Sequence, residues 1–231
     1  MFTLLVALLL LFLLCMFLMD TLQVLLRAVS TMLDAPVLGA HLGSVFMLAN
    51  RAATALALLT IGYFVDSYVA RGTLQWTYAA AASLIAIFHI PLLARKPLIA
   101  VTVKASTLLY RKSFQPELIA RSLAAGGDRA VADVSTPIAV IATVGLLGLL
   151  GPSLLAATYP DYRATLMQTG FIVNSAASII NVMYVERQIA MTLDEGDERK
   201  ISSLLHSYTV SRAVGYLLAA VAFLAIGLVL P

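Results

Sequence analysis

The chain has 231 residues, of which 61% are hydrophobic and 12% are charged, and its mean hydropathy is +0.95. Because an average soluble domain is about 25% charged, this composition excludes an ordinary soluble protein and predicts a polytopic membrane protein. The net charge of +3 comes mostly from one polar segment. It therefore concerns topology and lipid contact, and we expect no nucleic-acid partner.

The N-terminal run MFTLLVALLLLFLLCMFLMD predicts a transmembrane helix that is retained in the protein. It lacks the basic residues and the small-residue cleavage site of a signal peptide. Five further apolar runs follow it along the chain. Together they predict an all-α fold in one transmembrane domain, residues 1–231, with spans near 2–28, 41–66, 74–94, 136–158, 164–186 and 206–230.

The segment 95–135, between the third and fourth spans, is too polar to cross a bilayer. It predicts an amphipathic helix over 97–112 and a second helix from Pro116 to about Ala125, which "GG" at 126–127 would end. The expected apolar face of the first helix consists of Leu98, Val101, Ala105, Leu108 and Leu109.

This first helix is expected to lie in the headgroup layer of the membrane. Lys104 and Arg111 belong to a polar stripe on another of its faces. Two interpretations stay open. The basic residues either anchor the segment to the membrane, or Lys104 and Arg111 receive an anionic lipid headgroup before transport.

The distribution of lysine and arginine predicts the orientation of the chain. The loops 95–135 and 187–205 hold ten of these residues, whereas the connections on the other side hold only Arg71 and Arg163. Since basic loops stay in the cytoplasm, we expect both loops there and both termini outside.

The sequence contains no catalytic motif. It has no GxxxxGK[ST] phosphate-binding loop, no HExxH and no GxSxG, and its three histidines lie in separate segments. We therefore expect no enzyme, no metal site and no cofactor.

Polar residues inside the spans are the candidates for contact with a transported molecule. They are Asp20, Arg27, Asn50, Arg51, Asn174 and Asn181. Arg51 is the most unusual of them, because it lies about nine residues into its predicted span, roughly 13 Å deep. A guanidinium at such depth costs about 2.5–3.5 kcal/mol on insertion scales.

Two compatible hypotheses explain Arg51. It forms a structural ion pair with Asp20 of the preceding span, or it binds a phosphate, whose oxygens match the fork of a guanidinium. For Asn174 and Asn181, which share a helix face, hydrogen bonds between helices are an alternative to ligand contact.

The second and fifth spans share a short pattern. The second contains NRAAT (50–54) and the fifth NSAAS (174–178), and a phenylalanine closely precedes each. Because these spans cross the membrane in opposite directions, the pattern agrees with an inverted 3+3 repeat, in which a binding site lies at the midplane interface of the two halves.

Three longer stretches resemble the Amj family of bacterial membrane proteins: DTLQVLLRAVST (20–31), SVFMLANRAATALALLTIGYFVD (44–66) and YPDYRATLMQTGFIVNSAASIINVMYVERQIAMTLDEGD (159–197). The resemblance implies a flippase that moves lipid II, the lipid-linked precursor of peptidoglycan, to the outer leaflet of the bacterial cytoplasmic membrane during cell wall synthesis. It carries over no established site residue.

Two other function classes stay open beside the flippase. One is a membrane scaffold in cell-envelope synthesis, and the other is an enzyme that acts on isoprenoid phosphates. The expected partners are lipid II and membrane lipids, and a homodimer is left open. A polar cavity that opens sideways to lipid would favour the flippase, and a closed, dry bundle the scaffold.

The predicted orientation can be tested by cysteine labelling in intact cells, in a chain whose Cys15 is replaced by serine. We expect a membrane-impermeant maleimide to label Thr3→Cys and Val229→Cys but not Ser113→Cys, because position 113 belongs to the basic loop. Labelling of Ser113→Cys from outside would overturn the orientation.

Overall fold

The computed structural model describes residues 2–67, 69–111, 114–124 and 132–229. Within these ranges the fold is all-α, and six helices are long and apolar enough to cross a membrane, so the chain is a multi-pass membrane protein. The elements are α1 (Phe2–Met32), α2 (Pro36–Asp66), α3 (Arg71–His89), η1 (Ile90–Leu93), α4 (Arg95–Tyr110), α5 (Pro116–Ala124), α6 (Ala132–Thr158), η2 (Pro160–Tyr162), α7 (Arg163–Ile180), η3 (Asn181–Glu186), α8 (Arg187–Asp194) and α9 (Glu198–Val229).

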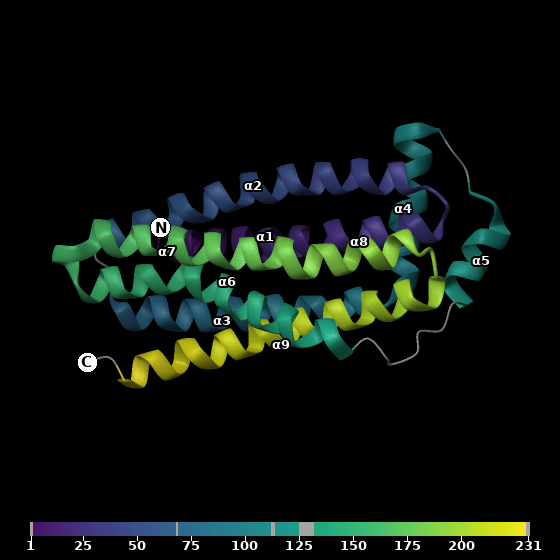
Figure 1. The fold of residues 1–231 in the computed structure, drawn as a ribbon. Helices are drawn as coiled ribbons and strands as arrows, with labels where there is room; N and C mark the ends of the chain where they lie inside the picture. Colours follow the sequence, from purple (N-terminus) through teal and green to yellow (C-terminus); the bar gives the residue numbers. More distant parts are fainter. Residues whose placement is uncertain (1, 68, 112–113, 125–131, 230–231) are drawn as a thin grey trace.

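The six long helices run side by side, and both chain ends lie at the end of the bundle away from α4 and α5 (Figure 1). Six spans and the shared end of the termini agree with the predicted topology. Which end faces the cytoplasm stays a prediction from the distribution of basic residues.

Several helices extend past the predicted limits of their spans. The second begins at Pro36 and not near 41, the sixth begins at Glu198 and not near 206, and the fifth continues through η3 and α8 to Asp194. Hydrophobicity predicts where the lipid ends, whereas backbone hydrogen bonds can continue a helix into water.

The turn between α1 and α2 is tight. Asp34 adopts a left-handed conformation with φ 50°, and the amide of Ala35 donates to the carbonyl of Ser30 over 2.8 Å. Pro36 then opens α2, where its missing N–H leaves no helix bond unmade.

The helices pack in the order α2–α1–α3–α9–α6–α7, so that α2 and α7 stand at the two ends of this arrangement. Of the six candidate spans, these two also have the smallest buried share of their apolar windows, 11% and 6%. The protein core therefore lies among the other four helices, and α2 and α7 are each held mainly by one neighbour.

Glycines allow the closest helix contacts. A Cβ on Gly39 of α2 would lie 2.7 Å from the Cβ of Ser30 on α1, and one on Gly215 of α9 would lie 2.4 Å from the carbonyl oxygen of Ala139 on α6. Gly170 of α7 likewise meets the backbone of α6. Small residues permit such close approach within a membrane.

Segment 95–135 forms two helices, as predicted, but the first uses a different inner face. Leu98 is buried as expected, whereas Val101 and Leu108 are exposed, and Thr102 and Ser106 are buried in their place. The Thr102 hydroxyl donates to the Leu98 carbonyl, so it can be buried without an unmet hydrogen bond. This side-chain bond is the reason why apolarity alone misplaced the face.

The limits of these two helices also differ slightly from the prediction. The first ends at Tyr110, because Arg111 is left-handed with φ 54°. The second covers Pro116–Ala124, and the "GG" expected to end it lies outside the described residues.

The α1–α2 contact generates a stability prediction. Gly39→Ala should lower the free energy of unfolding by about 1–3 kcal/mol, because the added methyl group has no space between Ser30 and the Arg27 backbone. Gly62→Ala on the same helix is the matched control, since nothing lies within 4 Å of its added methyl group. Thermal unfolding in detergent measures both. Equal melting temperatures would contradict this account of the contact.

Candidate functional site

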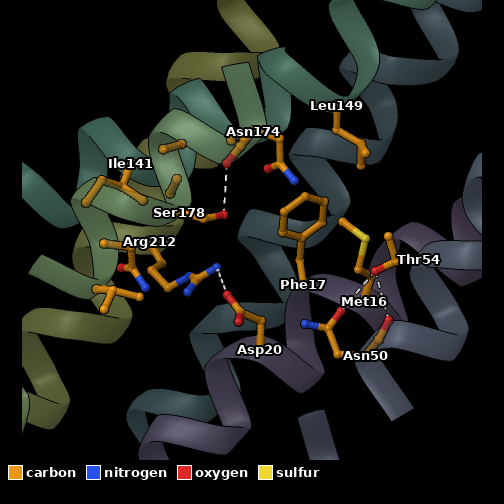
Figure 2. Close-up of a pocket in the computed structure, with 15 residues that line it drawn as sticks. Met16, Phe17, Asp20, Asn50, Thr54, Ile141, Leu149, Asn174, Ser178 and Arg212 are labelled. Carbon is orange, nitrogen blue, oxygen red and sulfur yellow. Dashed lines mark hydrogen bonds and ion pairs between the residues drawn. The ribbon is translucent and has the colours of Figure 1, made fainter. Parts of the chain in front are cut away.

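A polar cavity of about 250 Å³ lies among α1, α2, α6, α7 and α9 (Figure 2). Its polar lining consists of Asp20, Asn50, Thr54, Asn174, Ser178, Asn181 and Arg212. Asn50 and Arg212 both lie 14 residues into their helices, about 21 Å from the helix start, so the cavity is near the middle of the spans. Four of the six residues predicted for substrate contact line it, namely Asp20, Asn50, Asn174 and Asn181.

The cavity is placed where the bundle is least closed. Asn50 and Thr54 come from α2 and Asn174 and Ser178 from α7, the two helices at the ends of the packing order. Figure 2 shows these two pairs approaching the cavity from different sides. A molecule in the bilayer can therefore reach the cavity laterally if α2 and α7 part.

Asp20 is paired with Arg212 and not with Arg51. The Arg212 Nη2 lies 2.5 Å from the Asp20 Oδ2, and the two side chains point toward each other in Figure 2. The predicted pairing of Asp20 with Arg51 is wrong, because a closer guanidinium comes from α9, which is remote in sequence but adjacent to α1 and α3 in space.

Two tyrosines one turn away on α9 hold Arg212 in place. The Arg212 Nη1 donates to the Tyr208 hydroxyl over 2.7 Å, and Nε and Nη2 donate to the Tyr216 hydroxyl over 2.9 and 2.6 Å. Tyr208 and Tyr216 are both buried, and the guanidinium carbon lies 5.5 and 5.6 Å from their ring centroids. Arg212 itself is 8% exposed.

This arrangement leaves the guanidinium partly available to an anion. A guanidinium has five N–H donors. Three of them point to tyrosine hydroxyls and one to Asp20, which leaves one on Nη1. The Asp20 side chain is 42% exposed. An anion entering the cavity can therefore replace the carboxylate while the tyrosines keep Arg212 in its position.

A second buried polar group joins α1 to α3 beside this ion pair. The Thr21 hydroxyl lies 2.8 Å from the His89 Nε2, and the His89 Nδ1 lies 2.7 Å from the Ile85 carbonyl oxygen. Because a carbonyl only accepts, Nδ1 carries the proton, and in the neutral ring Nε2 accepts from Thr21. His89 ends α3 and is fully buried.

The two short patterns of the predicted repeat contribute residues to the same cavity. Asn50 and Asn174 line the same cavity, and the hydroxyls of Thr54 and Ser178 each donate over 2.8 Å to the asparagine carbonyl four residues earlier. This correspondence agrees with an inverted repeat at its midplane interface. A repeat of the complete halves stays a prediction.

Arg51 lies beside the cavity and does not line it. It is exposed, and it follows Asn50 by about 100° around α2. Thr54 lines the cavity and Ala53 is buried in the core, whereas Arg51 lies about 60° beyond Thr54, on the side of α2 that is turned away from Ala53. Contact between Arg51 and a phosphate stays a prediction, and it concerns a position beside the cavity and not inside it.

Arg27 was predicted to contact the transported molecule, but it does not line the cavity. Its Nη1 donates to the Glu186 Oε2 over 3.3 Å, and Gly43 of α2 packs against its aliphatic carbons. Glu186 ends the π-helical segment η3, whose first residue, Asn181, lines the cavity. The ion pair therefore joins this π-helical segment to α1. π-Helical turns often occur at functional sites.

A second hollow lies at the end of the bundle that is predicted to face outside. Asp66 of α2 and Asp161 of η2 line it, together with Arg163, whose Nη1 is 3.3 Å from the Asp66 Oδ1. Among the described residues, no three His, Cys, Asp or Glu side chains are grouped so that they could hold a metal ion.

Comparison of the chain with protein-family models, with curated proteins and with solved structures gave no match. The resemblance to the Amj family therefore stays an expectation from the sequence. The site is described by its own geometry alone.

Sequence reasoning missed Arg212, although its surroundings carried a usable pattern. In YTVSRAVGY (208–216) a tyrosine lies four residues before and four residues after the arginine. Residues four apart share a helix face, so the pattern indicates a guanidinium with two hydroxyl partners on its own helix. Thr54 and Ser178 were missed because hydroxyls inside a membrane helix usually bond to their own backbone.

The exposed stripe of α4 yields a prediction about lipid binding. Lys104 and Arg111 are exposed, as are the apolar Val101 and Leu108. Reversing both basic residues to glutamate should weaken binding to anionic vesicles by more than about 1 kcal/mol per position. Vesicle co-sedimentation or flotation measures the loss. Unchanged binding would exclude a role of this stripe in lipid contact. If binding falls while the initial transport rate in liposomes is unchanged, the stripe is only an anchor.

Proposed function

We propose that the protein is a lipid flippase of the bacterial cytoplasmic membrane and that its cargo is a polyprenyl-linked diphosphate, with lipid II as the physiological example. The observation that carries this proposal is the polar cavity at mid-membrane depth, which holds a fixed guanidinium and lies between the two least buried spans. The resemblance of three sequence stretches to the Amj family supports the same function.

The chemistry of the cargo fits the chemistry of the cavity. A diphosphate presents anionic oxygens that a rigid, multiply bonded guanidinium binds well. Asn50, Asn174 and Asn181 add amide donors for phosphate or sugar oxygens. The polyprenyl tail needs no protein path, because it is soluble in the hydrocarbon, and a lateral opening lets it stay there.

The size of the cavity requires a movement during transport. A volume of about 250 Å³ accommodates a diphosphate but not a disaccharide with its peptide. The headgroup can therefore cross only if α2 and α7 move apart, and the weak burial of these two helices makes them the ones that can move. The π-helical segment η3 at the end of α7 offers a place for bending.

The membrane potential can supply a driving force. An inside-negative membrane potential favours the outward movement of one negative charge by about 2.3 kcal/mol per 100 mV. A diphosphate diester carries two such charges. This proposal therefore needs no nucleotide-binding site.

The scaffold and the isoprenoid-phosphate enzyme are the alternatives. A scaffold has no need of a charged group facing an open cavity, since buried charges are costly. For an enzyme, a cluster of metal-binding carboxylates is expected. Asp20 lines the central cavity, whereas Asp66 and Asp161 line the separate hollow at one end of the bundle. The cavity favours the transporter.

Reconstitution into liposomes with labelled lipid II tests the proposal by measuring accessibility from each leaflet. Wild-type protein should accelerate exchange between leaflets. Arg212→Lys should reduce the initial rate at least tenfold, because an ammonium keeps the charge but lacks the planar fork that holds Tyr208 and Tyr216 and presents two parallel donors to a phosphate. Arg199→Gln in the exposed first turn of α9 is the matched control and should flip normally.

The double variant Asp20→Asn with Arg212→Gln separates binding from structure. It removes both charges, so no unpaired charge remains in the membrane. We expect a folded protein that does not flip lipid II. Flipping at the wild-type rate would mean that Arg212 is only half of a structural ion pair, and it would overturn the proposal. Exchange that wild-type protein does not accelerate would overturn it as well.

A further inference from the structure

The ion pair in the cavity has a consequence for how the cargo binds, which rests on the proposed function. Asp20 and a phosphate need the same Nη2 hydrogen bond of Arg212. The other donors of this guanidinium are mostly held by tyrosines. A phosphate oxygen can reach the remaining Nη1 donor beside the existing pair, but a bidentate contact needs Nη2 as well, and for this the phosphate must replace the carboxylate.

The displaced carboxylate is left in an unfavourable place. Around Asp20, the charged and titratable groups are Arg212, Tyr208 and Tyr216 on α9, and His89 on α3 beyond Thr21. Glu186 lies near Tyr208 but is paired with Arg27. Once the phosphate holds Arg212, none of these groups supplies a second positive charge to the carboxylate, and Arg51 of α2 does not line the cavity.

The other residues that line the cavity provide little stabilisation for the displaced Asp20 carboxylate. Asn50 and Asn181 are neutral, and Met16 and Phe17 are apolar. An ionised carboxylate beside a diphosphate at this depth meets both a desolvation cost and like-charge repulsion. Uptake of a proton removes both costs, and 42% exposure of the side chain leaves Asp20 accessible from the cavity.

We propose that this site couples cargo binding to protonation: one proton from cavity water binds the Asp20 carboxylate when a phosphate oxygen of the cargo replaces it on Arg212. The Arg212 hydrogen bond passes from a carboxylate oxygen to a phosphate oxygen, and the carboxylate becomes a carboxylic acid. No covalent bond to carbon or phosphorus changes. Release of the cargo returns the proton to water and restores the ion pair.

The geometry also explains why Asp20 and not the histidine takes the proton. The His89 Nε2 faces the Thr21 hydroxyl and is fully buried, whereas the Asp20 carboxylate faces the cavity. A proton arriving with water reaches the carboxylate first. Its site lies directly where the phosphate binds, so the two events are linked by contact and not over a distance.

Calorimetric titration of the detergent-solubilised full chain tests this coupling. The probe is farnesyl-diphospho-N-acetylglucosamine, because its diphosphate is a diester and keeps a constant charge between roughly pH 5.5 and 8. Titration in buffers of different ionisation enthalpy gives the number of protons taken up on binding. We expect net uptake approaching one proton by the wild type, and an affinity that falls by up to about tenfold per pH unit as the pH rises.

Two variants make the result specific. Asp20→Asn imitates the protonated carboxylic acid, so it should bind the probe without proton uptake and with an affinity independent of pH. Asp66→Asn at the other end of the bundle removes a carboxylate outside the cavity and should keep the wild-type uptake. Both variants bind through an unchanged Arg212.

The outcomes separate this inference from the proposed function. Binding by the wild type without proton uptake overturns the coupling and leaves the flippase proposal intact. Uptake that persists in Asp20→Asn also overturns it, because the proton then binds elsewhere. Absence of probe binding by the wild type overturns both proposals.

Discussion

One ion pair near the middle of the spans organises the polar site of the protein. Asp20 and Arg212 bring α1 and α9 together, and the tyrosines of α9 keep the arginine in place whether or not the carboxylate is bound. Thr21, next to Asp20, connects the same part of α1 to His89 of α3. Three helices therefore meet at one polar layer, because each charge is too costly to leave unpaired in lipid.

The low burial of α2 and α7 also follows from the energetics of a membrane. Close contacts through Gly39 and Gly170 fix each of these helices to one neighbour, and their remaining surface faces lipid or the cavity. Lipid is as apolar as a leucine side chain, so burial of further surface adds little stability within a membrane. Polar residues on the inner edges of these helices, such as Asn50 and Asn174, then define the opening between them.

Composition and apolar runs were sufficient to predict the six helices, since the thickness of the bilayer fixes how long an apolar helix must be. The residues of the site were only partly predictable. Asn174 and Asn181 were found because polar groups in a span are rare, but the partner of Asp20 lies 192 positions away in sequence. Arg51 attracted attention as the obvious charge in an apolar run, whereas Arg212 was masked by serine and tyrosine neighbours.

The difference between the two arginines shows what each can contribute. Hydrogen bonds to tyrosine hydroxyls already restrict the conformation of the Arg212 side chain, so it can bind an anion with little further loss of conformational entropy. Arg51 follows the cavity-lining Asn50 on α2 and is exposed, with a long, flexible type of side chain. A charge of that kind attracts an anion toward the opening more than it fixes one. A polar path that crosses a membrane needs both properties, attraction at the rim and a preorganised group inside.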